Sequence, residues 1–170
     1  MDFLKLAEDR FSVREFSDKK VEKDVIEKIL KAGQVAPTAC NRQPQRIFVI
    51  ESEEALAKFR KCTRSHFNAP LAILVCFDKE ECWTRDYDGK SSGDIDASIV
   101  CTHMMLEAAN LGIGSTWVMY FIPEAVREEF QLTDSLEPTA LLVMGYPKED
   151  VTPNPLHYKT KSIEDTVTYL

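Results

Sequence analysis

Leu71-Ala72-Ile73-Leu74-Val75-Cys76-Phe77 is an unbroken apolar run that lies between Pro70 and Asp78. A run of this length and composition is typical of a strand that is covered on both faces of its sheet. Outward from it, the β-branched and aromatic residues of 46–50 predict a second strand, and residues 139–144 predict another buried strand. Residues 115–119 predict a short strand or an extended turn. The run at 71–77 therefore indicates the centre of a sheet.

Helical periodicity fills the stretches between these strands. Residues 24–36 place apolar side chains on one face, and Pro37 closes that helix. Shorter helices are expected at 53–61 and 123–130. A long helix is expected from Asp94, as its cap, to about Leu111. Its inward stripe is predicted to be Ile95, Ile99, Thr102, Leu106 and Ala109.

Two segments fall outside this pattern. Residues 78–93 are rich in charge and predict a surface excursion. The tail, residues 151–170, has prolines, two lysines and a β-prone end, but no apolar helical face. An extended tail of this kind is expected to lie on another surface, such as a partner subunit.

Composition narrows the possible functions. The chain has 170 residues and neither repeats nor linkers, which predicts one domain over 1–170. Its net charge of −7 argues against nucleic-acid and acidic-membrane partners, which require clustered cations. Its five cysteines and three histidines show no ligand spacing, so no metal site is expected. We find no transmembrane run and no signal peptide, and therefore expect a cytoplasmic protein.

The opening motif, Arg10-Phe11-Ser12-Val13-Arg14, carries two guanidinium groups and a hydroxyl. If the segment is extended, its side chains alternate, so Arg10, Ser12 and Arg14 face one side. Such an edge suits a phosphate and carbonyl oxygens. A solvated amphipathic strand is the alternative, and these five residues alone leave it open.

A second motif is the amide loop, Ala36-Pro37-Thr38-Ala39-Cys40-Asn41-Arg42-Gln43-Pro44. Its two prolines predict a structured loop between a helix and a strand. Asn41 and Gln43 offer donors and acceptors that suit the edge of a heterocycle with alternating C=O and N–H groups. A loop stabilised by its own amide side chains remains the alternative.

The third motif, Gly112-Ile113-Gly114-Ser115-Thr116-Trp117, lacks the third glycine of a dinucleotide fingerprint. It also follows a helix instead of a strand, which argues against a Rossmann site. Its glycines are expected to end the helix and to let backbone approach a flat ring.

In order and spacing, these motifs resemble the nitroreductase family of FMN-dependent oxidoreductases. The matches continue with Ala69-Pro70 before the buried run, with Leu141–Pro147, and with Lys159 and Lys161 before the final extended stretch. The resemblance covers residues from about 3 to 167. It implies an α+β fold: a three-layer sandwich with a mixed, mostly antiparallel central sheet and helices on both faces. It also implies an intertwined homodimer with two FMN sites at the interface.

The resemblance implies roles for particular residues. Arg10 would meet the FMN phosphate, and Ser12 the phosphate or the ribityl chain. Arg14 would lie near N1 and O2 of the flavin, where a cation favours the anion that forms on hydride uptake. Lys159 and Lys161 would close on the phosphate. No residue is assigned as catalytic, because the flavin carries the chemistry.

Two further groups would reach the ring. The amide loop would come from the partner subunit and contact the same flavin through Pro37, Thr38, Ala39, Asn41 and Gln43. The backbone of one segment would pass the pyrimidine and N5 side of the ring, namely Trp117, Val118 and Met119.

The implied activity is hydride transfer from NADH or NADPH, through FMN, to a small electron-poor acceptor such as a nitroaromatic or a quinone, in a ping-pong mechanism. One alternative is a non-catalytic flavin carrier or redox-sensing dimer. Another is different flavin chemistry on the same scaffold, such as reductive dehalogenation or flavin fragmentation. Two features depart from the family: the chain is short, and Tyr120 stands where a small residue is common. We interpret Cys40, which has no base partner, as a packing residue.

Overall fold

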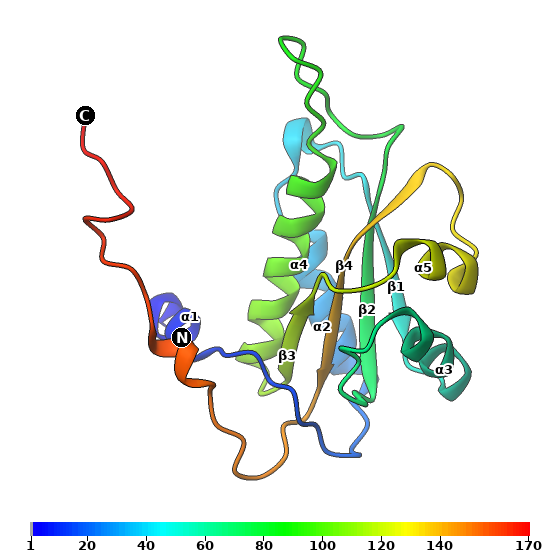
Figure 1. The fold of residues 1–170 in the computed structure, drawn as a ribbon, viewed down its shortest axis with the longest axis vertical. Helices are drawn as coiled ribbons and strands as arrows, with labels where there is room; N and C mark the ends of the chain where they lie inside the picture. Colours follow the sequence, from blue (N-terminus) through cyan, green and yellow to red (C-terminus); the bar gives the residue numbers. More distant parts are fainter. Residues whose placement is uncertain (1) are drawn as a thin grey trace.

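The computed structural model describes residues 2–170 (Figure 1). Its elements in chain order are α1 (Phe3–Asp9), α2 (Lys23–Gln34), η1 (Ala39–Asn41), β1 (Gln45–Ile50), α3 (Glu53–Cys62), β2 (Leu71–Asp78), α4 (Gly93–Asn110), β3 (Gly114–Val118), α5 (Pro123–Phe130), β4 (Leu136–Gly145) and η2 (Pro155–Tyr158).

The four strands form one sheet in the order β1-β2-β4-β3, and every pairing between them is antiparallel. Among the described residues the only parallel pairing is an isolated bridge between Ser12 and Ser115. The parallel part of the expected mixed sheet is therefore limited to this bridge. Strand β3 lies at one edge of the sheet, and the opening motif runs alongside it.

Helices cover both faces of the sheet, which confirms the three-layer α+β prediction (Figure 1). Strand β2 shows the reason, because its successive side chains point to opposite faces. Leu71, Ile73 and Val75 pack with α2 and α4, whereas Ala72 and Leu74 pack with α3 and α5. All five side chains are buried, as the unbroken apolar run predicted.

The predictions for helix α4 were wrong in two details. The helix begins at Gly93 with Ser92 as its N-cap residue, and the Asp94 carboxylate instead accepts a hydrogen bond from Thr139 Oγ1 at 3.0 Å. The expected inward stripe is not the most buried face: Ile95 is 51% exposed, and the other four residues of the stripe are half-buried. The buried side chains of α4 are offset by about one position and include Ala97, Val100 and Met104. Both stripes are apolar, so periodicity alone could not choose between them.

Three other segments add to the sequence-based picture. The first residues form α1, which was not predicted; the Asp2 carboxylate caps it by accepting from Leu4 N at 3.0 Å. The 78–93 excursion contains a short hairpin with a bridge between Thr84 and Ser91. Beyond η2 the tail runs away from the sheet, and residues 158–170 are exposed (Figure 1).

Within residues 2–170, no helix has both the length and the apolar character needed to cross a bilayer.

Candidate functional site

The opening motif is extended and lies along the edge of β3. Ser12 forms a parallel bridge with Ser115, and Val13 N donates to Ser115 O at 3.0 Å. The Val13 side chain is buried against Gly114, where a Cβ atom would come within 2.7 Å of it. This close approach requires glycine at position 114. The backbone of the motif is thus fixed in the predicted alternating conformation.

The two arginines of the motif have different neighbours. Arg10 is partly buried, and its Nη1 lies 3.8 Å from the Met105 sulfur. Arg14 is exposed; its Nη1 donates to Ser12 O at 3.2 Å, and its guanidinium carbon lies 5.9 Å from the centre of the Phe67 ring. Within residues 2–170 neither guanidinium forms an ion pair with a carboxylate. Both charges are therefore available to an anionic ligand.

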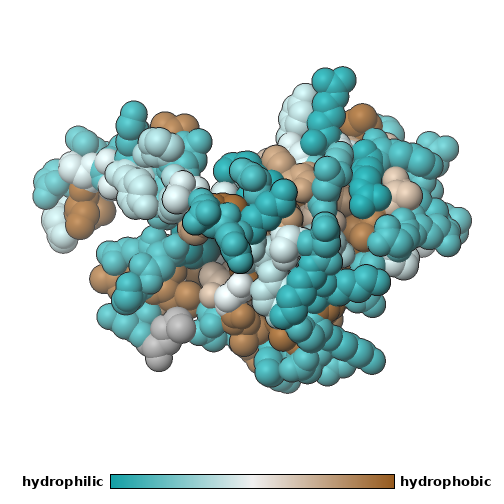
Figure 2. All heavy atoms as spheres, turned by 90° about the horizontal axis from the view of Figure 1, so that it is seen from below, coloured by the Kyte–Doolittle hydropathy of each residue, from teal (hydrophilic) through white to brown (hydrophobic). Residues whose placement is uncertain are grey.

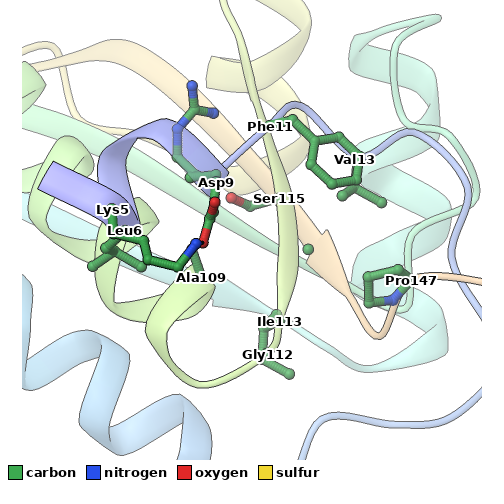
Figure 3. A pocket seen from close by; sticks show the side chains of 12 residues that line it. Lys5, Leu6, Asp9, Phe11, Val13, Ala109, Gly112, Ile113, Ser115 and Pro147 are labelled. Carbon is green, nitrogen blue, oxygen red and sulfur yellow. Dashed lines mark hydrogen bonds and ion pairs between the residues drawn. The ribbon is translucent and has the colours of Figure 1, made fainter. Parts of the chain in front are cut away.

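A pocket of about 310 Å³ lies between α1, the opening motif and the start of β3 (Figure 3). Its wall includes Arg10, Phe11, Val13, Gly112 and Ser115. The Ser115 hydroxyl is buried and has no hydrogen-bond partner among the described residues, which is costly unless a ligand or water supplies one. An orphaned hydroxyl in a pocket that also has an unpaired guanidinium fits a phosphate or a hydroxylated chain.

The last side chains of β3 pack alternately into the apolar cores on the two faces of the sheet. Trp117 packs on the α2/α4 side, and Val118 is buried on the α3/α5 side. Met119 and Tyr120 follow the strand and are 78% and 75% exposed. The side chains of Trp117 and Val118 are thus used for packing. Their backbone lies along the edge of the sheet.

The amide loop is a structured connection between α2 and β1. Thr38 Oγ1 accepts from Gln43 N at 3.0 Å, so the loop is partly held by its own side chains. Cys40, Asn41 and Gln43 have φ angles of 49°, 50° and 51°. Left-handed backbone is uncommon for non-glycine residues and persists where the surroundings fix it. The Asn41 side chain is exposed and makes no hydrogen bond within residues 2–170.

Asp96 is the main residue that the sequence analysis missed. It is 2% exposed, and its two carboxylate oxygens accept from Ala39 N at 2.8 Å and from Ser92 Oγ at 2.7 Å. It thereby ties the amide loop to the first turn of α4. Asp96 lies four residues before Val100 and eight before Met104, both buried, and this helical spacing was the signal that could have identified it.

The amide loop and the opening motif contact α4 at different positions along the helix axis. Ala39 is bound by Asp96 in the first turn, whereas Arg10 contacts Met105, nine residues further on. Nine residues correspond to roughly 14 Å along a helix axis. The structure thus brings the opening motif together with β3 and leaves the amide loop apart from them.

The tail approaches the opening motif only at η2. His157 Nε2 lies 3.0 Å from Glu8 O, and the His157 ring meets the Phe11 ring edge-on at 6.3 Å. Lys159 and Lys161 are exposed beyond this point, and the structure does not bring them to Arg10.

The buried cysteines are poor nucleophiles. Burial raises the pKa of Cys62 to about 11, and it raises the pKa values of Cys76 and Cys101 to about 12. Their thiols are thus protonated at neutral pH. Cys40 is exposed and unbonded. In the described part of the chain, no three or more His, Cys, Asp or Glu residues gather as metal ligands would.

The fold is thus an α+β sandwich in which an extended segment with two unpaired guanidinium groups lies beside an edge strand, an arrangement that suits an anionic ligand. Comparison with known sequences is more specific: the sequence profile of the Nitroreductase family matches residues 7–72 and 64–146. The chain belongs to this family.

Individual relatives agree with this assignment. A protein of Archaeoglobus fulgidus, named provisionally as an NADH dehydrogenase/NAD(P)H nitroreductase, is 32% identical over 160 residues, which cover 86% of each chain. A crystal structure of a nitroreductase family protein from Clostridium difficile is 48% identical, with a TM-score of 0.93 over 99% of this chain and 98% of that chain. An FMN-dependent nitroreductase from the same species is 27% identical, with a TM-score of 0.79 over 98% of both chains.

Proposed function

We propose that this protein is an FMN-dependent oxidoreductase that passes hydride from NADH or NADPH, through the flavin, to a small electron-poor acceptor such as a nitroaromatic or a quinone. Residues 1–170 form one FMN-binding domain in this proposal. The observation that carries it is the unpaired cationic edge of the opening motif beside β3, in a chain of the Nitroreductase family. The FMN dependence of one relative and the NAD(P)H in the name of another support the cofactor and the donor.

Within this proposal the opening motif holds one side of the cofactor. FMN supplies a ring that accepts and releases hydride. Arg10 binds the phosphate with its planar fork, and Ser12 binds the phosphate or the ribityl chain. The orphaned Ser115 hydroxyl completes this end. Arg14 lies near N1 and O2, where its charge stabilises negative charge that develops on the ring.

The remaining contacts come from three segments. The backbone of Trp117, Val118 and Met119 passes the pyrimidine and N5 side of the ring. Lys159 and Lys161 close on the phosphate. The partner subunit's amide loop covers the ring through a set of neighbouring residues, namely Pro37, Thr38, Ala39, Asn41 and Gln43.

We propose a homodimer, which the placement of these parts supports. Because the amide loop is held at the other end of α4 from Arg10, a second, oppositely directed copy supplies it. Apolar side chains that one subunit leaves exposed support this arrangement, including Ile95 (51%), Ile163 (65%) and Tyr169 (89%). Figure 2 shows apolar surface on both the body and the separate lobe formed by the tail. A stable interface of this kind buries more than about 2,000 Å².

The donor and the acceptor use the same face of the site in succession, which makes the kinetics ping-pong. The site selects acceptors only by their size and flatness, so we expect several acceptors to react. A cytoplasmic location belongs to the proposal, since NADH and NADPH are intracellular metabolites.

The test is optical. Purified protein should be yellow, with flavin absorption bands that bleach on anaerobic addition of NADH or NADPH and return when menadione is added. Steady NAD(P)H consumption with menadione separates an enzyme from a flavin carrier. Colourless protein that does not take up added FMN would overturn the proposal.

A further inference from the structure

One short segment of this acidic protein is strongly basic. Residues 58–66, Lys-Phe-Arg-Lys-Cys-Thr-Arg-Ser-His, contain four Lys or Arg residues and no acidic residue, although the chain carries a net charge of −7. The segment spans the end of α3 and the turn that follows it. A local excess of cations on an acidic protein attracts anions to that place.

Part of this segment lines a pocket of about 400 Å³. One wall carries Arg60, Lys61 and Arg64, and the other carries Tyr120, Phe121 and Ile122. Tyr120 and Ile122 are 75% and 55% exposed. The pocket therefore combines a cationic wall with an exposed apolar wall.

The three cations of this wall are not equivalent. Lys61 forms an ion pair with Glu129 at 2.7 Å. Arg60 and Arg64 are exposed and form no ion pair with any carboxylate of residues 2–170. A cation in the last turn of a helix is favourable by itself, which accounts for Arg60. It does not account for Arg64, which lies beyond the end of α3 at Cys62.

Hydrogen bonds join the two walls of this pocket, and one wall continues the segment that we place beside the flavin. Thr63 Oγ1 donates to Tyr120 O at 2.5 Å, and Ile122 N donates to Cys62 O at 2.9 Å. Tyr120 directly follows Met119, the last residue of the segment that we place along the ring. On the other side, Arg14 lies over the Phe67 ring of the same turn. The pocket thus opens between the segment that we place along the ring and the turn that Arg14 contacts.

We infer that Arg60 and Arg64 bind the phosphate groups of the nicotinamide dinucleotide donor, while its nicotinamide passes the exposed Met119–Tyr120 surface to reach the proposed flavin. The inference rests on the proposed function and assigns its donor subsite. The donor joins a flat ring to a pyrophosphate, and the pocket offers an apolar wall next to two guanidinium groups. Guanidinium groups bind phosphate in a bidentate manner. Burial chiefly, and the charge of Arg60 in addition, hold the pKa of His66 below its ordinary value, so His66 adds no charge at neutral pH.

The test uses the FMN-loaded protein and the double variant Arg60→Gln/Arg64→Gln. With menadione as acceptor, KM for NADH and NADPH should rise roughly tenfold while kcat changes little. The donor 1-benzyl-1,4-dihydronicotinamide has no phosphate, so its kinetics should stay at the wild-type level. Added salt should lower kcat/KM for NADPH in the wild type and have a smaller effect in the variant.

A matched control removes two positive charges elsewhere. The double variant Lys23→Gln/Lys28→Gln changes two exposed lysines of α2. It should leave KM for both dinucleotides unchanged. Wild-type KM values in the Arg60/Arg64 variant would overturn the inference. So would an equal loss with the benzyl donor, or a change confined to KM for the anionic acceptor 4-nitrobenzoate. Wild-type protein that no donor reduces would instead overturn the proposed function, and this inference with it.

Discussion

Arg10 and Arg14 belong to one extended segment, yet they occupy different surroundings. Arg10 lines the pocket that contains the orphaned Ser115 hydroxyl, whereas Arg14 is exposed over Phe67. In the proposed function, Arg10 anchors the cofactor and Arg14 supports the reaction electrostatically. Substitutions at the two positions should therefore change different measurable quantities.

Arg10→Ala should weaken FMN binding more than Lys161→Ala does. Arginine offers a fixed bidentate fork from a partly buried position, whereas Lys161 is a mobile charge on the exposed tail. Loss of a charge-assisted contact of about 1.5–3 kcal/mol lowers affinity roughly ten- to a hundredfold. Titration of flavin fluorescence measures both variants, and equal affinities would show that the phosphate lies elsewhere.

Arg14→Gln should lower the midpoint potential of bound FMN and change the affinity for oxidised FMN comparatively little. The substitution deletes a charge that favours the anionic reduced ring, but keeps hydrogen-bonding capacity. For a two-electron couple, about 30 mV corresponds to about 1.4 kcal/mol, so we expect a shift of some tens of millivolts. Reduction by NADH should slow as well.

Spectroelectrochemical titration of wild type and variant at one pH measures this shift. An unchanged potential together with a large loss of oxidised-FMN affinity would move Arg14 from the ring to the phosphate. That result would leave the flavoenzyme proposal intact.

At the scale of elements, the contact between Asp96 and Ala39 joins α4 to the amide loop. Asp96→Ala leaves the Ala39 N–H without its acceptor, and loss of such a buried partner costs about 1–3 kcal/mol. The left-handed residues of the loop should then relax, and FMN affinity should fall about tenfold or more. Asp96→Asn retains an acceptor oxygen for Ala39 N and should restore most of the affinity.

Ser92→Ala is the matched control, because it removes the other hydrogen bond of Asp96 and leaves the contact with Ala39 in place. FMN titration and thermal unfolding should be measured together. If Asp96→Ala lowers the melting temperature but leaves FMN affinity unchanged, Asp96 serves α4 alone.

The same helix shows what sequence reasoning could predict. The strands of the sheet were found because short apolar runs such as 71–77, which Pro70 and Asp78 bound, have the length of a strand and not of a helix. The existence of α4 was also predicted, but its orientation was not. A helix with two apolar stripes has no preferred face until its neighbours are known, so Ile95 was assigned inward and Asp96 was overlooked.

At the scale of the molecule, the order of the motifs was enough to name candidate site residues. It did not predict how those residues come together. The opening motif could be expected to alternate if extended, but its place beside β3 is known only from the structure. The separation of the amide loop from it depends on which end of α4 the loop joins, and that contact is made by Asp96. Lys159 and Lys161 were assigned by resemblance alone, and one subunit does not place them.

The protein should behave as a homodimer that the tail helps to hold together. Sedimentation at micromolar concentration should give twice the subunit mass of 19.4 kDa. Removal of 159–170, which are exposed on a single subunit, should weaken both association and FMN binding. A monomer that keeps its FMN at micromolar concentration would contradict the arrangement.

The distance along α4 between the Asp96 contact and Arg10 has a genetic consequence. If each flavin takes Arg10 from one chain and the amide loop from the other, Arg10→Ala and Asn41→Ala damage different halves of a site. A mixed dimer of the two defective chains then concentrates both lesions in one site and leaves the other intact. Unfolding and refolding an equal mixture should revive about a quarter of the wild-type activity, because half of randomly paired dimers are mixed. Two inactive alleles expressed in one cell should complement each other in the same way. If each chain builds its own site, the mixture stays as inactive as its parents.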